Sequence, residues 1–186
     1  MAKERVCPWW VGYLLACPLR RFLQDPAQIL APYVRAGMTV LEPGPGTGFF
    51  TLELARLVGD SGRVIAADIQ PKMLELLEKR AAKAGLRSRV ETRLVGPNSM
   101  DLPDFAGRVD FALAFAVVHE MPKPSHFFRE VNAALKPGGI TLLVEPKGHV
   151  KAEKFDQELA AAADAGLEVI GRPKVHRSHT TVLRKP

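Results

Sequence analysis

The feature that most constrains this sequence is a turn in which glycine recurs at every second position. A short strand is predicted before the turn, at Thr39–Glu42, and a helix is predicted after it, from about Phe49 to Val58. Glycine lets the backbone pass close to a ligand, and a helix N-terminus directs N–H groups toward the same point. A ligand site is therefore predicted where the strand ends. The residues that carry this prediction are Glu42, Gly44, Gly46 and Gly48.

Strands and helices alternate along the rest of the sequence. Short β-branched runs are followed by helical patterns, which is the rhythm of repeated βα units and predicts a mostly parallel sheet. The connection between the last two strands, Pro173–His179, is too short for a helical crossover, so these strands should pair antiparallel. Ser125 is predicted to cap a helix that ends at Lys136–Gly139. The predicted strands are 39–42, 63–68, 90–95, 109–115, 140–145, 167–172 and 180–184, and the predicted helices are 49–58, 71–84, 125–136 and 152–165.

The size and composition of the chain indicate one globular domain. Its 186 residues fit a single domain, with an N-terminal segment at 1–36 and a core at 37–186. The residues are 47% hydrophobic and 25% charged, well away from the composition of disordered chains. A net charge of +6 would favour nucleic acid or an anionic membrane surface, but the basic residues are spread along the chain. We therefore interpret them as a solvated basic surface.

The N-terminal segment is the least generic part of the sequence. Trp9 and Trp10 lie in it, and it is expected to be a helical cap that anchors on the domain or a lid over the ligand site. Its apolar stretch, Val6–Cys17, is too short to span a bilayer. Two cysteines, Cys7 and Cys17, are too few for a disulfide framework and indicate reduced thiols in a cytoplasmic protein. The residues before Cys17 also look like a bacterial lipoprotein processing site, so export stays open as an alternative.

A second acidic residue ends the next predicted strand. Asp68 lies twenty residues after Gly48, and a carboxylate at this point of an α/β fold faces a ribose, whose hydroxyl protons it can accept. The phase of the glycines argues against a pyrophosphate, because the pattern G-x-G-x-x-G would need glycine where Phe49 stands. A dinucleotide-dependent oxidoreductase is therefore disfavoured.

These motifs resemble those of the class I S-adenosylmethionine-dependent methyltransferases. The first motif of that family reads Glu/Asp-x-Gly-x-Gly-x-Gly, as Glu42–Gly48 does here. The resemblance covers most of the chain from Thr39 onward, including Asp68, the turn at Leu135–Gly139 and the terminal hairpin. The most similar group is the small ubiquinone/menaquinone-type methyltransferases. The resemblance implies an α/β, Rossmann-like three-layer sandwich, with a mostly parallel seven-stranded sheet and an antiparallel C-terminal hairpin.

The resemblance also implies roles for individual residues. The glycines would line the methionine part of S-adenosylmethionine, and the carboxylate before them would fix that end. Asp68 would hold the ribose, and Ile69 would flank the adenine. The family usually has Gly-Asp-Ala after the third strand, whereas this chain has Gly96–Met100, so Asn98 or Ser99 would contact the adenine instead. The implied cofactor-binding residues are Glu42, Gly44, Gly46, Gly48, Asp68, Ile69, Asn98, Ser99 and Phe115.

A candidate catalytic residue follows the fourth predicted strand. His119 stands just past the carboxyl end of this strand, where open α/β folds bind their ligands. It could take a proton from the methyl acceptor, or it could be a structural cap paired with Glu120. A metal site formed with Glu145 and His149 lacks a recognisable ligand spacing, so no metal is predicted.

We expect methyl transfer from S-adenosylmethionine to a small molecule. Many amino-group nucleic-acid methylases carry an Asn/Asp-Pro-Pro-Tyr/Phe tetrapeptide after the fourth strand, where this chain has Phe115–Val118. An RNA or protein acceptor stays open because of the basic surface, and so does a protein that binds the cofactor without catalysis. The sequence indicates neither the acceptor nor the oligomeric state.

Overall fold

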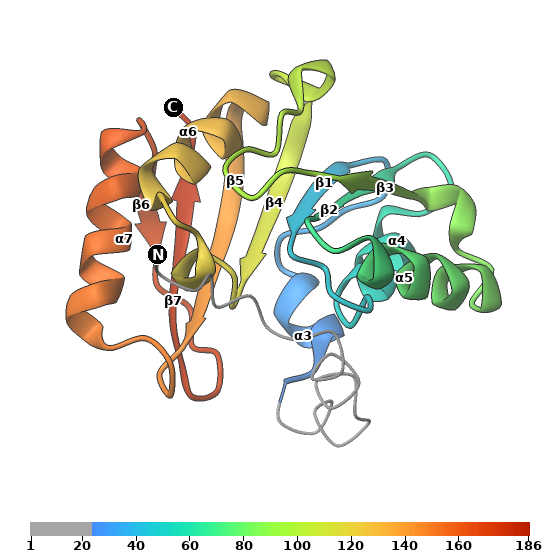
Figure 1. The fold of residues 1–186 in the computed structure, drawn as a ribbon, viewed down its shortest axis with the longest axis horizontal. Helices are drawn as coiled ribbons and strands as arrows, with labels where there is room; N and C mark the ends of the chain where they lie inside the picture. The colour runs from blue at the N-terminus through green and yellow to red at the C-terminus, as the bar shows by residue number, and fades with distance from the viewer. Residues whose placement is uncertain (1–23) are drawn as a thin grey trace.

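Seven strands form one sheet in the order β3-β2-β1-β4-β5-β7-β6, in a computed structural model that describes residues 24–186. Strands β1 to β5 pair in parallel, whereas β7 pairs antiparallel with both β5 and β6 (Figure 1). The predicted parallel sheet with an antiparallel C-terminal hairpin is confirmed. The strands are β1 (Thr39–Pro43), β2 (Arg63–Asp68), β3 (Val90–Leu94), β4 (Val109–Phe115), β5 (Leu135–Pro146), β6 (Glu168–Gly171) and β7 (Ser178–Arg184).

Helices cover both faces of this sheet, which confirms the three-layer arrangement (Figure 1). Successive side chains of a strand point to opposite faces. Val40 accordingly packs in one hydrophobic cluster with α3, α4 and α5, and its neighbour Leu41 packs in another with α6 and α7. The α-helices are α3 (Pro26–Leu30), α4 (Thr51–Val58), α5 (Pro71–Lys83), α6 (Pro124–Ala134) and α7 (Ala152–Asp164), and the short 3-10 helices are η1 (Arg87–Arg89), η2 (Pro103–Phe105) and η3 (Val118–Glu120).

The prediction that Ser125 caps α6 was wrong. The helix begins at Pro124, and Lys123 holds the N-cap position; within the described residues its side chain makes no capping hydrogen bond. The fixed φ of proline suits the first helical position, which explains the earlier start. The helix also ends earlier than predicted, at Ala134 rather than at Lys136, because strand β5 follows it at once.

The part of the N-terminal segment that the structure describes leads from α3 into the sheet. Asp25 caps α3 through its side chain, and Leu30 at the end of this helix is fully buried. The predictions for residues 1–23 lie outside the described residues; they concern the tryptophan anchor or lid, the two cysteines and the export alternative. Among residues 24–186, no helix is long and apolar enough to cross a membrane.

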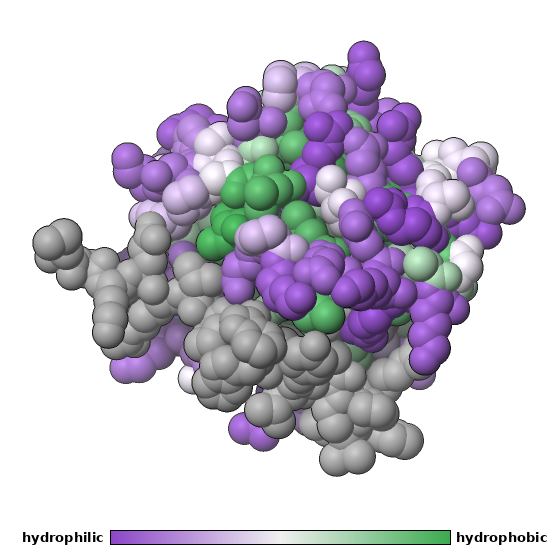
Figure 2. All heavy atoms as spheres, turned by 45° about the vertical axis from the view of Figure 1, so that its right-hand side comes forward, coloured by the Kyte–Doolittle hydropathy of each residue, from purple (hydrophilic) through white to green (hydrophobic). Residues whose placement is uncertain are grey.

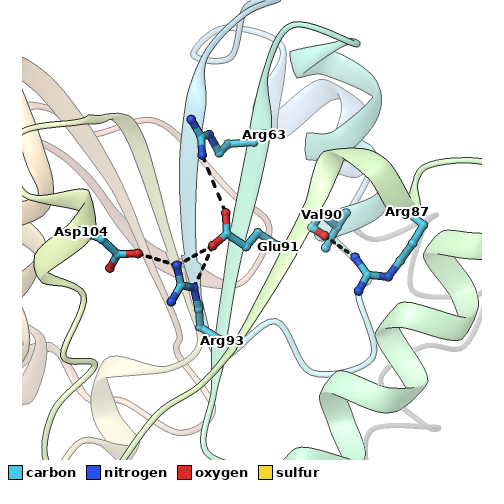
Figure 3. A network of polar contacts seen from close by, with 6 residues as sticks. All are labelled: Arg63, Arg87, Val90, Glu91, Arg93 and Asp104. Atoms are coloured by element: carbon cyan, nitrogen blue, oxygen red, sulfur yellow. Dashed lines mark hydrogen bonds and ion pairs between the residues drawn. The ribbon is translucent and has the colours of Figure 1, made fainter.

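Charged side chains line the edge of the sheet at β3 (Figure 3). Glu91 on β3 lies 2.6 Å from Arg93 and 3.8 Å from Arg63 of β2. Arg93 also forms an ion pair of 2.5 Å with Asp104. Each exposed pair adds little to the free energy of unfolding. A row of charges on an edge strand does, however, disfavour pairing with the strand of another molecule.

Candidate functional site

A cavity of about 670 Å³ opens at the carboxyl ends of the central strands. The chain runs outward from β1 to β3 on one side and from β4 to β5 on the other, and open α/β sheets bind ligands where the strand order reverses in this way. The volume of the cavity lies in the range of small-molecule sites. Figure 2 shows hydrophobic side chains gathered in the middle of one face of the molecule, with hydrophilic ones above and to the right of them. The predicted site residues that line the cavity are Glu42, Gly44, Gly46, Asp68, Ile69, Asn98, Ser99, Phe115 and His119.

The glycine-rich turn forms one wall of the cavity, and two of its glycines are required by close packing. Gly44, Gly46 and Gly48 all have positive φ, between 54° and 87°. A Cβ at Gly44 would lie 2.7 Å from a methyl group of Val117, so the turn and the loop after β4 touch there. A Cβ at Gly48 would collide with Leu77 of α5. Gly48, predicted to contact the cofactor, is not among the lining residues in the described part of the chain; its lack of a Cβ lets α5 pack against the turn.

Arg80 on α5 holds the same turn from the side of the helix. Its guanidinium donates hydrogen bonds to the carbonyl oxygen and the hydroxyl of Thr47, at 2.5 and 2.9 Å. Burial lowers the pKa of Arg80, so the two acceptors replace part of its lost hydration. The turn is therefore fixed by a helix outside the cavity.

Two buried carboxylates lie at this end of the cavity. Glu42 is 4% exposed, and its Oε2 has no hydrogen-bond partner of acceptable geometry among residues 24–186. Burial raises the pKa of Glu42 to about 7; the side chain of Thr51 opposes the rise, and the charge of Asp68 adds to it. The pKa of Asp68 is also raised by burial, although the backbone N–H groups of Gln70, Gly46 and Ile69 stabilise its charged form. Gln70 donates to Asp68 Oδ1 at 2.9 Å.

The loop after β3 is tied down by Glu130 of α6. The carboxylate of Glu130 accepts hydrogen bonds from the Ser99 hydroxyl at 2.5 Å and from the backbone N–H groups of Met100 at 3.1 Å and Asp101 at 3.2 Å. The hydroxyl of Ser99 is thus directed at Glu130, while Asn98 is exposed at the cavity wall. Asn98 and Ser99 were the two predicted polar contacts to the adenine. The Ser99 hydroxyl is bonded to Glu130, whereas the Asn98 side chain is not.

Aromatic side chains form the apolar part of the lining. The rings of Phe50 and Phe115 have centroids 4.3 Å apart, and Phe49 meets Phe50 edge to face at 5.0 Å. All three line the cavity. Phe49 therefore lies in the cavity wall, at the position where a diphosphate-binding turn would need glycine.

His119 lies on η3, and its carboxylate partner is Glu145 rather than Glu120. Its Nδ1 is 2.5 Å from Oε2 of Glu145, whereas its Nε2 is 4.0 Å from Glu120. The hydrogen bond with Glu145 raises the pKa of His119, and burial opposes the rise. The chain reaches this geometry through Ala116, whose φ of 55° is a left-handed conformation that costs about 1–2 kcal/mol for a residue with a Cβ.

Some contacts of the site carry no signal in the sequence. Arg80, Glu130 and Glu145 each act through a partner more than twenty positions away in the chain. Gln24 also lines the cavity, at the start of the described chain. Within residues 24–186, no group of three or more histidine, cysteine, aspartate or glutamate residues could hold a metal ion.

Known proteins resemble the chain in sequence and in structure. It is 32% identical over 112 residues to the ubiquinone/menaquinone biosynthesis C-methyltransferase UbiE of Enterobacter sp. (strain 638), which is 60% of this chain and 44% of that protein. It is 32% identical over 127 residues to the UbiE of Marinomonas sp. (strain MWYL1), which is 67% of this chain and 50% of that protein. The chain thus spans about half the length of the curated relatives it matches.

A solved structure matches over almost the whole chain. The crystal structure of a SAM-dependent methyltransferase from Aquifex aeolicus superposes with a TM-score of 0.86 at 28% identity, covering 97% of this chain and 100% of that one. A family model described as a methyltransferase domain matches residues 35–176. Together with the glycine-rich turn and the sheet order, these matches show that the chain belongs to the methyltransferase domain family, within the class I S-adenosylmethionine-dependent methyltransferases.

Proposed function

We propose that this protein transfers a methyl group from S-adenosylmethionine to a small-molecule acceptor. The observation that carries the proposal is that one cavity has the glycine-rich turn and two buried carboxylates at one end, and a histidine paired with a buried carboxylate in its lining. The relatives that carry the name C-methyltransferase support a small acceptor. A protein that depends on this cofactor is expected in the cytoplasm.

The residues at the turn fit the cofactor. Oε2 of Glu42 is a buried acceptor without a protein donor among the described residues, so an ammonium group such as that of methionine would satisfy it. Asp68 would accept hydrogen bonds from the ribose hydroxyls, and Ile69 would flank the adenine near Asn98. When bound, S-adenosylmethionine supplies a methyl group that its sulfonium makes electrophilic. The protein has to orient the acceptor, exclude water and receive a proton.

Charge pairing on the surface favours a small acceptor over RNA. Several basic residues that could attract a phosphate backbone already have acidic partners: Arg87 lies 2.9 Å from Glu78, and Arg89 lies 2.5 Å from Asp60. RNA or protein remains the second candidate because the net charge is +6. The test is transfer of a labelled methyl group from S-adenosylmethionine to the small-molecule fraction of a cell extract, compared with total RNA and protein. Label in RNA or protein alone would overturn the small-acceptor proposal, and no S-adenosylhomocysteine from any fraction would overturn catalysis itself.

Replacing Asp68 with asparagine should weaken S-adenosylhomocysteine binding about 10- to 100-fold, because hydrogen bonds to a charged group contribute more than those to an amide. Isothermal titration calorimetry measures the change. Asp164→Asn is the matched control, since Asp164 is exposed at the end of α7 and is not among the cavity-lining residues of the described chain. An Asp68→Asn variant with the affinity of the control would contradict the assignment of the ribose to Asp68.

Binding of S-adenosylhomocysteine near pH 7 should release protons from Glu42. The pKa of Glu42 is about 7 in the free protein, so part of the population is protonated at this pH. A bound ammonium group favours the charged carboxylate and lowers the pKa. The apparent binding enthalpy should therefore differ between buffers of different ionisation enthalpy. This difference in enthalpy between buffers should shrink in Glu42→Gln, and also well above pH 7, where Glu42 is already charged. An equal dependence of the enthalpy on the buffer in the wild-type protein and in Glu42→Gln would contradict the prediction.

A further inference from the structure

The carboxylate of Glu145 lies directly behind the imidazole of His119. Glu145 is the last residue but one of β5, and its side chain is fully buried. Its Oε2 is 2.5 Å from Nδ1 of His119, and its Oε1 accepts a hydrogen bond of 2.8 Å from the backbone N–H of Val118. A buried carboxylate needs donors that replace its hydration. Nδ1 of His119 is the side-chain atom that its Oε2 faces, and a charged carboxylate can only accept a hydrogen bond there.

This contact decides which nitrogen of His119 can accept a proton. A neutral imidazole carries one proton, and the hydrogen bond at one ring nitrogen determines its place. With Nδ1 donating to Glu145, the lone pair remains on Nε2. His119 lines the cavity with 15% of its side chain exposed, and Nε2 is the ring nitrogen that Glu145 leaves for a bound acceptor. Nε2 lies 4.0 Å from Glu120, too far for a hydrogen bond.

We propose that Glu145 is a positioning residue for methyl transfer, which fixes His119 with its proton on Nδ1 so that Nε2 receives the proton lost by the acceptor. The inference rests on the proposed function. As the acceptor atom bonds to the methyl carbon, the carbon–sulfur bond gives its electron pair to sulfur and the acceptor's proton moves to Nε2. The imidazolium that forms is neutralised by Glu145, and its proton then leaves to solvent.

Other ionisable groups surround the pair, and one of them provides a matched control. Glu158 on α7 is 1% exposed, and neither of its carboxyl oxygens has a hydrogen-bond partner within the described chain. Burial and the charge of Glu145 raise the pKa of Glu158 to about 7, so it is a neutral acid below that pH. The groups around the pair are Glu120 on η3, His149 after β5, Lys154 and Glu158 on α7, and His179 on β7, the register partner of Glu145.

The tautomer of His119 can be measured in the unmodified protein. A long-range ¹H–¹⁵N NMR spectrum, recorded above the pKa of His119 and assigned with His119→Gln, should show a protonated Nδ1 and a bare Nε2. The opposite tautomer would overturn the proposal. This measurement needs no acceptor, so it stands even if the proposed function fails.

Kinetics with Glu145→Gln test the consequence for the reaction. The rate of label transfer to the small-molecule fraction should fall about tenfold or more, because a base held in the wrong place or tautomer loses part of its effect. The acid limb of the pH profile should move to lower pH, since the hydrogen bond with Glu145 is what raises the pKa of His119. Binding of S-adenosylhomocysteine should not change. An acid limb at its original pH would overturn the proposal.

Two comparisons separate positioning from a general structural effect. Glu158→Gln makes the same substitution at another buried glutamate near His119 and Glu145. This variant should retain the wild-type rate below pH 7, where Glu158 is already neutral. In the His119→Ala background, Glu145→Gln should lower the rate no further, because the two residues act together. A further loss of rate in the double variant would show that Glu145 acts apart from His119, and it would overturn the proposal. No transfer by the wild-type protein would instead refute the proposed function and leave the NMR result to decide the tautomer.

Discussion

Replacing His119 with alanine is expected to lower kcat by about two to four orders of magnitude, the range that general bases contribute. The imidazole is the titratable group of the cavity whose pKa is held above its ordinary value by a buried carboxylate partner, so its loss leaves the acceptor proton without a receiver. Affinity for S-adenosylhomocysteine should remain within about twofold, because the carboxylates assigned to the cofactor are at the turn. Steady-state kinetics and calorimetry on the same preparation give both values.

The same experiment needs a histidine that has no part in the cavity. His176 is exposed in the connection between β6 and β7 and is not among the lining residues of the described chain, so His176→Ala should match the wild-type rate. The rate of the wild-type protein should fall as the pH drops through the pKa of His119, since a base works only when deprotonated. Unchanged kcat in His119→Ala would remove proton transfer from the role of this residue.

Replacing Gly44 with alanine should destabilise the protein by about 2–5 kcal/mol. The positive φ of Gly44 costs a residue with a Cβ about 1–2 kcal/mol. The added Cβ would lie 2.7 Å from a methyl group of Val117 and 3.4 Å from its Cβ, and relief of such overpacking costs about 1–3 kcal/mol more. The loop that leads to His119 would have to move. Urea unfolding without cofactor measures the loss of stability.

Gly46 provides the control within the same turn. Its φ is 54°, but a Cβ there would meet no atom within 4 Å in the described part of the protein. Gly46→Ala should therefore lower the free energy of unfolding only by the cost of the positive φ, about 1–2 kcal/mol. Equal destabilisation by the two variants would show that the contact with Val117 carries no energy.

The sequence was sufficient for the features that depend on local pattern. The glycine-rich turn, the strand that ends at Asp68 and the terminal hairpin follow from residue type and spacing, and the fold agrees with them. Helix ends do not follow from local pattern in the same way, because neighbouring residues compete for the same capping position. Ser125 is a good cap by type, but Pro124 occupies the first helical position and leaves Ser125 inside α6.

The partners of the site residues could not be predicted in the same way. His119 was recognisable from its place after a strand, but Glu145 reaches it from the next strand of the sheet, and their contact depends on the register of β4 against β5. Glu130 holds the loop after β3 from the middle of α6, through bonds to backbone N–H groups that any sequence would offer. Such pairings are decided by tertiary packing, which no local pattern encodes.

Arg80 and Leu77 of α5 hold the glycine-rich turn in place, and this reduces the part of a ligand's binding free energy that is spent on ordering the turn. A loop that is already ordered by a neighbouring helix loses little conformational entropy when a ligand arrives. The end of the cavity that we assign to the cofactor is in this sense preorganised during folding, through contacts on the far side of the turn. Substitutions on that inner surface of α5 should therefore weaken cofactor affinity without touching the cofactor.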